Sequence, residues 1–287
     1  MANVDVKAFF DEATFTVSYV VSDPATRRAA IVDPVLDYDP SSGRTSTTSA
    51  DLISSYIQES GLAIDWILET HVHADHLSGA PCLKGRHGGQ IAIGVHVASV
   101  QDTFKKIFNI DTLAVDGSQF DHLFNDGEAF KIGDIDAHVL ATPGHTPACI
   151  TYVIGDSAFV GDTLFMPDFG TARTDFPGGD AAQLYTSIQK IFALPDNTRL
   201  FMCHDYKAPG RDVFAWQTSI PDQRGKNIHI NKNVSEREFI VLREGRDSQL
   251  GMPKLLLPAI QVNIRAGALP DPESNGVSYL KIPIDAV

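Results

Sequence analysis

Short apolar segments and segments with helical spacing follow one another along the first two thirds of the chain. Residues 7–10, 14–22 and 28–35 are rich in Val, Phe, Tyr and Ile and predict strands. Apolar residues then recur at helical spacing over 50–60, and Gly61 is expected to end that helix. The chain therefore begins with strands at the edge of a sheet and continues into a helix.

The next segments repeat the order of a strand, a loop and a helix. We predict strands at 66–69, 91–94, 130–142 and 199–202, a hairpin of 150–154 with 157–160, and helices that begin at 77–83 and cover 98–108 and 181–192. A polar stretch at 39–49 separates the first strands from the first helix. Both halves are β-rich first and helical afterwards, which favours two sheets sandwiched between helices, an α/β fold.

The chain beyond Pro209 is less periodic. Residues 231–243 and 249–259 are predicted to be helical pieces joined by polar loops. We therefore expect a catalytic domain over 1–210 and, at 211–287, a C-terminal extension packed on that same domain.

Composition narrows the class of protein. The 287 residues are 43% hydrophobic and 21% charged, which is typical of a folded globular chain. Neither a secretory signal nor an apolar stretch of about 18 residues is present, so we expect a cytoplasmic protein without a membrane span. A net charge of −13 argues against a nucleic-acid partner. Three cysteines, at positions 82, 149 and 203, are too few for a disulfide framework.

Histidines and aspartates gather in the loops that directly follow predicted strands. These residues are His71, His73, Asp75, His76, His145, Asp162 and His204. Imidazole nitrogen and carboxylate oxygen suit zinc, iron or manganese, whereas a structural zinc site would be rich in thiolates. Glycines before His145 and Asp162 permit the tight turns that would bring these segments together. The pattern predicts a metal centre at the strand ends.

The order of these motifs resembles the metallo-β-lactamase superfamily. The series His71-x-His73-x-Asp75-His76, then Thr-Pro-Gly-His145, then Gly-Asp162-Thr, then His204 is similar to the superfamily's full set of motifs and covers roughly residues 5–210. The resemblance implies an αββα sandwich, two mixed β-sheets flanked by helices, with the metal site at one edge of the sheets.

Within the superfamily, the chain looks most like the persulfide dioxygenases, also called sulfur dioxygenases, and next like glyoxalase II. Residues 170–176 resemble the Gly-x-x-Arg-Thr-Asp-Phe run of the dioxygenases, and residues 203–206 resemble their Ala-His-Asp-Tyr. The chain departs from the human-type member in its polar 39–49 stretch and in its long extension after Gly210. Both families act on substrates linked to glutathione.

The resemblance implies a reaction and a set of roles. One Fe(II) per chain would be held by His71, His145 and Asp162, leaving open positions for O₂ and for the sulfur of glutathione persulfide, which would be oxidised to sulfite and glutathione. The resemblance also implies a homodimer. Residues expected to orient the ligands, or to be alternative ligands, are His73, Asp75, His76 and His204. Substrate contacts are expected from Arg173, Tyr206 and Lys207, although Arg173 could instead pair with Asp175 or Asp205.

Other functions stay open at this point. A hydrolase of the glyoxalase II kind would use two zinc ions that share Asp162, with His71, His73 and His145 on one ion and Asp75, His76 and His204 on the other. Every ligand for that arrangement is present, so ligand identity alone does not separate the two enzymes. A metal-free scaffold and an enzyme with Cys149 or Cys203 as nucleophile are further alternatives.

Overall fold

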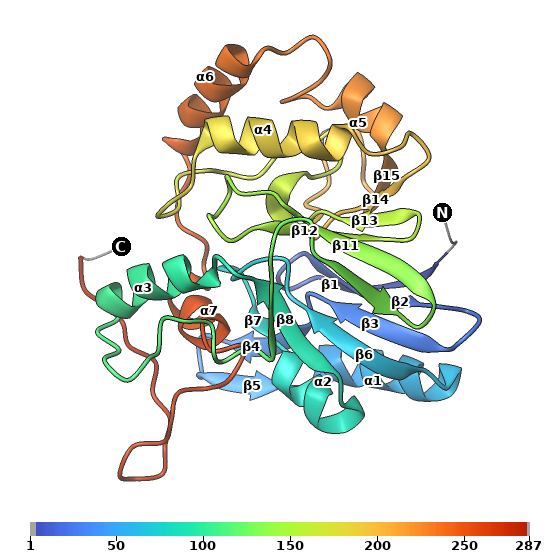
Figure 1. Ribbon diagram of the computed structural model, residues 1–287. Helices are drawn as coiled ribbons and strands as arrows, with labels where there is room; N and C mark the ends of the chain where they lie inside the picture. Colours follow the sequence, from blue (N-terminus) through green and yellow to red (C-terminus); the bar gives the residue numbers. More distant parts are fainter. Residues whose placement is uncertain (1–3, 286–287) are drawn as a thin grey trace.

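Two β-sheets pack face to face and helices cover both outer faces in the computed structural model, which describes residues 4–285 (Figure 1). The expected αββα sandwich is confirmed. The first sheet has the order β1 (Asp5–Asp11), β2 (Thr16–Ser22), β3 (Arg28–Val32), β6 (Ala63–Leu68), β8 (Gln90–Gly94) and β9 (His122–Phe124). The second has the order β10 (Ala129–Ile132), β11 (Ile135–Ala141), β12 (Ile150–Ile154), β13 (Ser157–Phe159), β14 (Arg199–Phe201) and β15 (Gln217–Ser219).

Both sheets are mixed. Strands β1, β2 and β3 pair antiparallel, and β3, β6, β8 and β9 continue in parallel. In the second sheet only β13 and β14 are parallel. Parallel neighbours need a crossover, and the helices α1 (Thr48–Ser60), α2 (Ala80–His87) and α4 (Ala181–Phe192) provide three of them. The carboxyl ends of these strands therefore meet at one edge of the sandwich.

Three apolar clusters hold the layers together. Large side chains from both sheets, such as Tyr19, Phe124 and Tyr152, fill the space between the sheets. The outer face of the first sheet is covered by α1, α2, α3 (Val97–Ile107) and α7 (Leu256–Asn263). The outer face of the second is covered by α4, α5 (Ile220–Lys226) and α6 (Glu236–Asp247). The C-terminal helices therefore contribute to both helical layers.

Several predicted elements have different bounds in the structure. The polar 39–49 stretch contains a hairpin, because β4 (Val35–Asp39) pairs with β5 (Arg44–Ser46), and β4 also pairs with β7 (Leu77–Ser78). Residues 77–78 are thus a strand, and the helix expected to begin there starts at Ala80. The single strand predicted at 130–142 is two strands joined by a turn at Gly133, which has a φ of 58°.

The region after Pro209 is more regular than its sequence pattern indicates. Strand β15 extends the second sheet, and α5 was not predicted. The helix predicted at 231–243 begins instead at Glu236, because Ser235 and Glu238 form a capping box at its start. The helix predicted at 249–259 is displaced to α7.

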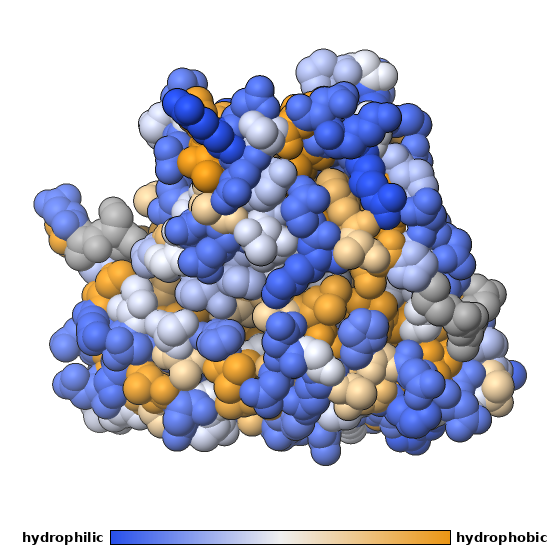
Figure 2. Space-filling view, turned by 45° about the horizontal axis from the view of Figure 1, so that its top comes forward, coloured by the Kyte–Doolittle hydropathy of each residue, from blue (hydrophilic) through white to orange (hydrophobic). Residues whose placement is uncertain are grey.

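The surface is mainly hydrophilic in the view of Figure 2, with apolar areas lying between the polar ones. Within residues 4–285, no helix is long and apolar enough to cross a membrane.

Candidate metal centre

The predicted ligand residues lie in four loops that follow strand ends. The loop after β6 carries His71, the loop after β11 carries His145, the 3₁₀ turn η1 (Gly161–Thr163) after β13 carries Asp162, and the loop after β14 carries His204. The sheet topology brings these loops to the same edge. A nitrogen of His71, a nitrogen of His145 and an oxygen of Asp162 all lie within 4.8 Å of one another.

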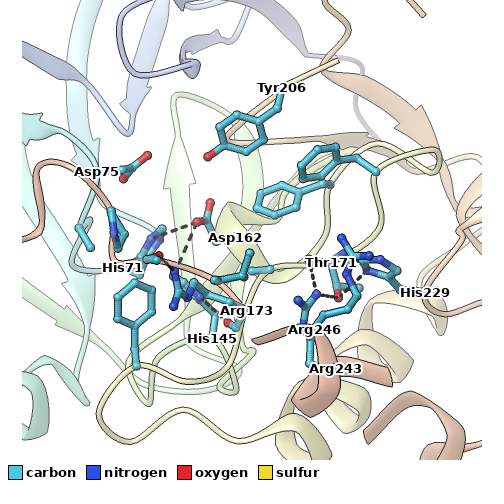
Figure 3. A pocket seen from close by; sticks show the side chains of 18 residues that line it. His71, Asp75, His145, Asp162, Thr171, Arg173, Tyr206, His229, Arg243 and Arg246 are labelled. Atoms are coloured by element: carbon cyan, nitrogen blue, oxygen red, sulfur yellow. Dashed lines mark hydrogen bonds and ion pairs between the residues drawn. The ribbon is translucent and has the colours of Figure 1, made fainter. Parts of the chain in front are cut away.

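The distances in this group suit a shared cation. Asp162 Oδ2 lies 3.9 Å from His71 Nε2 and 3.6 Å from His145 Nε2. These separations exceed a hydrogen bond but are natural for atoms that contact one ion at about 2.0–2.2 Å. All three side chains are buried, and they converge at one end of a cavity (Figure 3). The donor set and its spacing therefore fit a metal ion.

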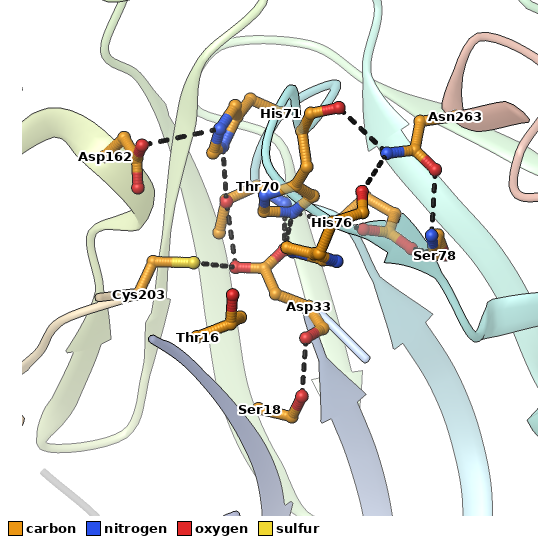
Figure 4. Close-up of polar contacts among 12 residues, drawn as sticks. Thr16, Ser18, Asp33, Thr70, His71, His76, Ser78, Asp162, Cys203 and Asn263 are labelled. Atoms are coloured by element: carbon orange, nitrogen blue, oxygen red, sulfur yellow. Dashed lines mark hydrogen bonds and ion pairs between the residues drawn. The ribbon is translucent and has the colours of Figure 1, made fainter. Parts of the chain in front are cut away.

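Hydrogen bonds fix which nitrogen of each histidine is available. The Nδ1–H of His145 donates to the Arg173 carbonyl over 2.8 Å, so its Nε2 keeps a lone pair. The Thr70 hydroxyl donates to Asp33 Oδ2 over 2.9 Å, and it therefore accepts a hydrogen bond of 3.0 Å from His71 Nδ1 (Figure 4). Both Nε2 atoms are thus ready to bind a cation before it arrives.

Burial also keeps His71 neutral. Burial, and then the neighbouring His73 and His145, hold the pKa of His71 well below its ordinary value. Because a metal ligand must be a neutral imidazole, no proton has to leave His71 near neutral pH.

A second group of donors lies behind the first. Its members are His73, Asp75, His76 and His204, and atoms of His73, Asp75 and His76 lie within 4.8 Å of one another. His73 Nδ1 and His76 Nε2 are buried and have no hydrogen-bond partner among the described residues, whereas His204 Nε2 faces Asp75 Oδ2 and Asp162 Oδ1 as an ion pair. Unpartnered buried polar atoms are costly without an ion or water, so this group also has the chemistry of a cation site.

Charge distinguishes the second group from the first. His204 Nε2 lies 3.0 Å from Asp75 Oδ2 and 3.3 Å from Asp162 Oδ1. Burial opposes a charge on His204, but the two carboxylates outweigh burial and raise its pKa to about 9. A cation that entered this second position would have to displace the His204 proton, whereas His71 in the first group has no proton to lose near neutral pH.

Asp33 and Asn263 support the ligand loop, and no sequence pattern indicated either role. Asp33 follows β3 and accepts from the Thr70 backbone N–H (2.7 Å), the Thr70 hydroxyl and His73 Nε2 (3.0 Å). Asn263, at the end of α7, donates to the carbonyls of His73 (2.9 Å) and His76 (2.8 Å) (Figure 4). The backbone of the ligand loop is therefore fixed by β3 on one side and by the C-terminal region on the other.

The cavity has a metal-ligand end, an aromatic wall and a basic end. Its volume is about 340 Å³. Phe165, Phe169 and Phe176 form much of the wall, and Thr171, His229, Arg243 and Arg246 line the end opposite the ligands (Figure 3). Of the predicted ligands, His71, Asp75, His145 and Asp162 line the cavity; His73, His76 and His204 are not among its lining residues within the described chain.

The three predicted substrate contacts have different surroundings. Tyr206 lines the cavity and packs near Phe165 and Phe169. Arg173 lines it too, but its guanidinium forms two hydrogen bonds with Asp175, of 2.5 and 2.6 Å, and donates to the Gly251 carbonyl. The pairing with Asp175 that the sequence left open is therefore present. Lys207 does not line this cavity, because its Nζ lies over the Phe214 ring, 4.4 Å from the centroid.

The cysteines do not have the surroundings of a nucleophile. Burial raises the pKa of the Cys149 thiol to about 12 and that of Cys203 well above its usual value. The thiolate is the reactive form, so neither side chain is activated.

A sandwich of two sheets with histidines and aspartates at the strand ends defines a metal-binding enzyme scaffold. The family model described as Metallo-beta-lactamase superfamily matches residues 12–204, and the chain belongs to that superfamily. A probable metallo-hydrolase of Burkholderia pseudomallei is 53% identical over 98% of this chain and 99% of the relative. Glyoxylase B2 of Dictyostelium discoideum is 50% identical over 98% and 97%. The mitochondrial persulfide dioxygenase ETHE1 of Mus musculus is 30% identical over 94% and 92%.

Solved structures agree with the family. The crystal structure of ETHE1 from Myxococcus xanthus matches 92% of this chain and 100% of that chain, with a TM-score of 0.72 and 31% identity.

The chain also matches the beta-lactamase hydrolase-like proteins of Xylella fastidiosa and Agrobacterium fabrum at 53% sequence identity, but spans only 65% of their length. The names of the relatives thus include both hydrolases and a dioxygenase.

Proposed function

We propose that this protein is a persulfide dioxygenase that converts glutathione persulfide, O₂ and water to glutathione and sulfite at one Fe(II) held by His71, His145 and Asp162. The main observation in support is that these three side chains, two imidazoles and one carboxylate, lie together and line one end of the cavity. Two histidines and a carboxylate with open positions are the ligand set typical of non-haem Fe(II) oxygenases. The likeness to ETHE1 proteins supports the same reaction.

When bound, ferrous iron supplies the redox chemistry that activates O₂. The chain supplies the surroundings. The Thr70 hydroxyl and the Arg173 backbone carbonyl engage Nδ1 of His71 and of His145, so that each Nε2 would be free to hold the ion. The phenylalanine wall excludes water around the persulfide sulfur, and the basic end suits a carboxylate of the glutathione. The Arg173 side chain is a positioning group in this proposal. Its guanidinium pairs with Asp175, and this pair fixes the backbone of the segment whose Arg173 carbonyl accepts the hydrogen bond from His145.

A hydrolase with two zinc ions is the second candidate, because the buried His73 Nδ1 and His76 Nε2 of the second donor group have no hydrogen-bond partner in the described part of the chain. The 50% identity to Glyoxylase B2 favours the same alternative. Under the dioxygenase proposal, His73, Asp75, His76 and His204 support the iron ligands and hold no ion of their own.

Metal content and O₂ consumption separate the two candidates. Protein purified without added metal is analysed for elements, and the iron-loaded protein is then given glutathione persulfide in an oxygen electrode. We expect one iron per chain, O₂ uptake and sulfite release. Two zinc ions per chain, with turnover of a glutathione thioester and no O₂ uptake, would refute the dioxygenase.

Replacing a ligand tests the site itself. We expect His145→Ala to lose most of the bound iron and all measurable O₂ uptake, because it leaves two ligands in place of three. His138→Ala on β11 is the matched control, since His138 neither lines the cavity nor belongs to a donor group. If His145→Ala kept its iron at the level of His138→Ala, the assigned ligand set would be wrong.

A further inference from the structure

The end of the cavity opposite the metal ligands is built around α6, outside the motifs that identify the superfamily. Arg243 and Arg246 lie one turn apart on this helix and both line the cavity. Arg243 is buried, and its guanidinium already has protein partners: it pairs with Asp247 and donates to the Thr171 carbonyl over 3.0 Å. Arg246 is exposed, and within residues 4–285 it forms no ion pair. Arg246 is therefore the cation at this end that a ligand can use.

His229 adds a hydrogen-bond donor beside that cation. Its side chain is 3% exposed and lines the cavity. Its Nδ1 accepts the Thr171 backbone N–H over 3.0 Å, so Nδ1 carries no proton and the neutral ring has its proton on Nε2. Burial, and then the nearby Arg243 and Arg246, lower the pKa of His229 to about 4, which keeps the ring neutral at pH 7. Nε2 has no hydrogen-bond partner among the described residues.

The His229 ring is held in this place by the backbone beside it. Gly170 has a φ of 106°, and a Cβ there would lie 2.1 Å from His229 Nδ1. Asn227 also donates to the Gly170 carbonyl over 3.1 Å. The first residue of the Gly-x-x-Arg-Thr-Asp-Phe segment thus leaves room for the histidine, and the cavity end is a preformed part of the fold.

We propose that His229 and Arg246 form a carboxylate site that binds the glycyl carboxylate of the glutathione moiety. This proposal rests on the proposed function for the identity of the substrate. A donor N–H and one free guanidinium match a single carboxylate. The γ-glutamyl end of glutathione carries an ammonium group beside its carboxylate, and the unpaired guanidinium of Arg246 repels that ammonium. The glycyl end has no such charge. The persulfide end of the substrate would then point toward His71, His145 and Asp162, which line the other end of the cavity (Figure 3).

Two substrates and three proteins test the site. Wild type, Arg246→Gln and the control Arg237→Gln are assayed with glutathione persulfide and with its glycyl ethyl ester. Arg237 is exposed on the same helix and does not line the cavity. We expect Arg246→Gln to raise KM for glutathione persulfide roughly tenfold with little change in kcat, and Arg237→Gln to behave as wild type.

The ester identifies which carboxylate is bound. In the wild type, KM for the ester is expected to exceed KM for the free acid by a similar factor, and in Arg246→Gln this difference should shrink to the smaller part that His229 provides. An Arg246→Gln enzyme with wild-type KM, or one that discriminates between acid and ester as strongly as the wild type, would overturn the site. His229→Phe keeps an aromatic ring but removes the Nε2–H donor, so it should raise KM for glutathione persulfide severalfold. An unchanged KM in the folded variant would show that His229 does not belong to the site.

The two proposals fail in different ways. If the iron-loaded wild type takes up no O₂, the dioxygenase proposal fails, and calorimetric binding of glutathione still tests the carboxylate site. Weaker glutathione binding in Arg246→Gln than in Arg237→Gln sustains the site; equal dissociation constants for the two variants reject it. If O₂ uptake is normal and the KM values are equal, only the carboxylate site is wrong.

Discussion

The ion pair between Arg243 and Asp247 connects α6 to the loop that supports the metal ligands. Asp247 Oδ1 accepts from Arg243 Nε at 2.9 Å and from Nη2 at 2.7 Å. Asp247 Oδ2 accepts from the Thr174 backbone N–H at 2.8 Å and from its hydroxyl at 3.0 Å. The two charged side chains are only 3% and 4% exposed. Asp247→Ala therefore removes one partner of a buried pair and two hydrogen bonds of the loop.

The expected loss of stability is large. Removing one partner of a buried ion pair costs about 3–5 kcal/mol, because the remaining charge stays buried without compensation. The unpaired Thr174 N–H adds to this penalty, although neighbouring effects do not sum. We expect Asp247→Ala to lower the free energy of unfolding by about 3–5 kcal/mol. The affinity for the metal ion should also fall, because the adjacent Arg173 carbonyl holds His145, a candidate ligand.

Urea unfolding of the metal-free protein measures this effect. The control is Asp102→Ala on α3, since Asp102 and Lys106 have the same spacing of four residues but are 52% and 71% exposed. That control should cost less than about 0.5 kcal/mol. The double variant Arg243→Met with Asp247→Leu should recover much of the lost stability, because no charge is left buried. Equal losses for Asp247→Ala and Asp102→Ala would refute the argument that burial makes this pair important.

Three further predictions concern residues around the site. Asp33→Asn should weaken metal binding by about 10–100-fold, measured by competition with a chelator, because the carboxylate no longer orients Thr70; an unchanged affinity would contradict this. Gly170→Ala should destabilise the protein more than Gly210→Ala in urea, since both glycines have positive φ but only Gly170 would clash with a neighbour; equal losses would dismiss the clash. The pKa of His229 is about 4 in the folded protein and about 6.5 in the unfolded chain. Between these pH values the unfolded chain binds more protons than the folded protein. The free energy of unfolding therefore falls as the pH falls from about 6.5 to about 4. Metal-free wild type should lose about 2 kcal/mol from this group between pH 7 and 5, and His229→Gln should lose correspondingly less; identical pH profiles would show that His229 does not titrate this way.

The sequence predicted that the candidate metal ligands lie together because their pattern is local. His71, His145 and Asp162 each follow a predicted strand directly, so the topology of a two-sheet sandwich was enough to expect them at one edge. Their supporting residues are different. Asp33 lies 37 positions before Thr70, and Asn263 lies 190 positions after His73. Contacts over such separations depend on how whole layers pack, which no short pattern records.

The C-terminal region was harder to predict for the same reason. Its helices lack a simple apolar stripe, because α6 buries the charged Arg243 and Asp247 beside Phe239, and α7 buries six of its eight residues. Hydrogen bonds to other segments hold them in place, such as those of Arg243 to the Thr171 carbonyl and of Gln261 to the Lys281 carbonyl. The strand Gln217–Ser219 has only three residues and forms because it pairs with β14. Periodicity is a weak signal where tertiary pairing, and not an amphipathic face, determines the element.

The outer hydrogen-bond partner of each histidine determines what that histidine can bind in the cavity. His145 donates from Nδ1 to a carbonyl, so its Nε2 presents a lone pair and suits a cation. His229 accepts at Nδ1 from a backbone N–H, so its Nε2 presents a proton and suits an anion. The two partners, the Arg173 carbonyl and the Thr171 N–H, belong to one loop, and Asp247 and Arg243 hold that loop to α6. One short segment therefore gives the two ends of the cavity opposite affinities, and the proposed substrate, with a sulfur at one end and a carboxylate at the other, would match both ends.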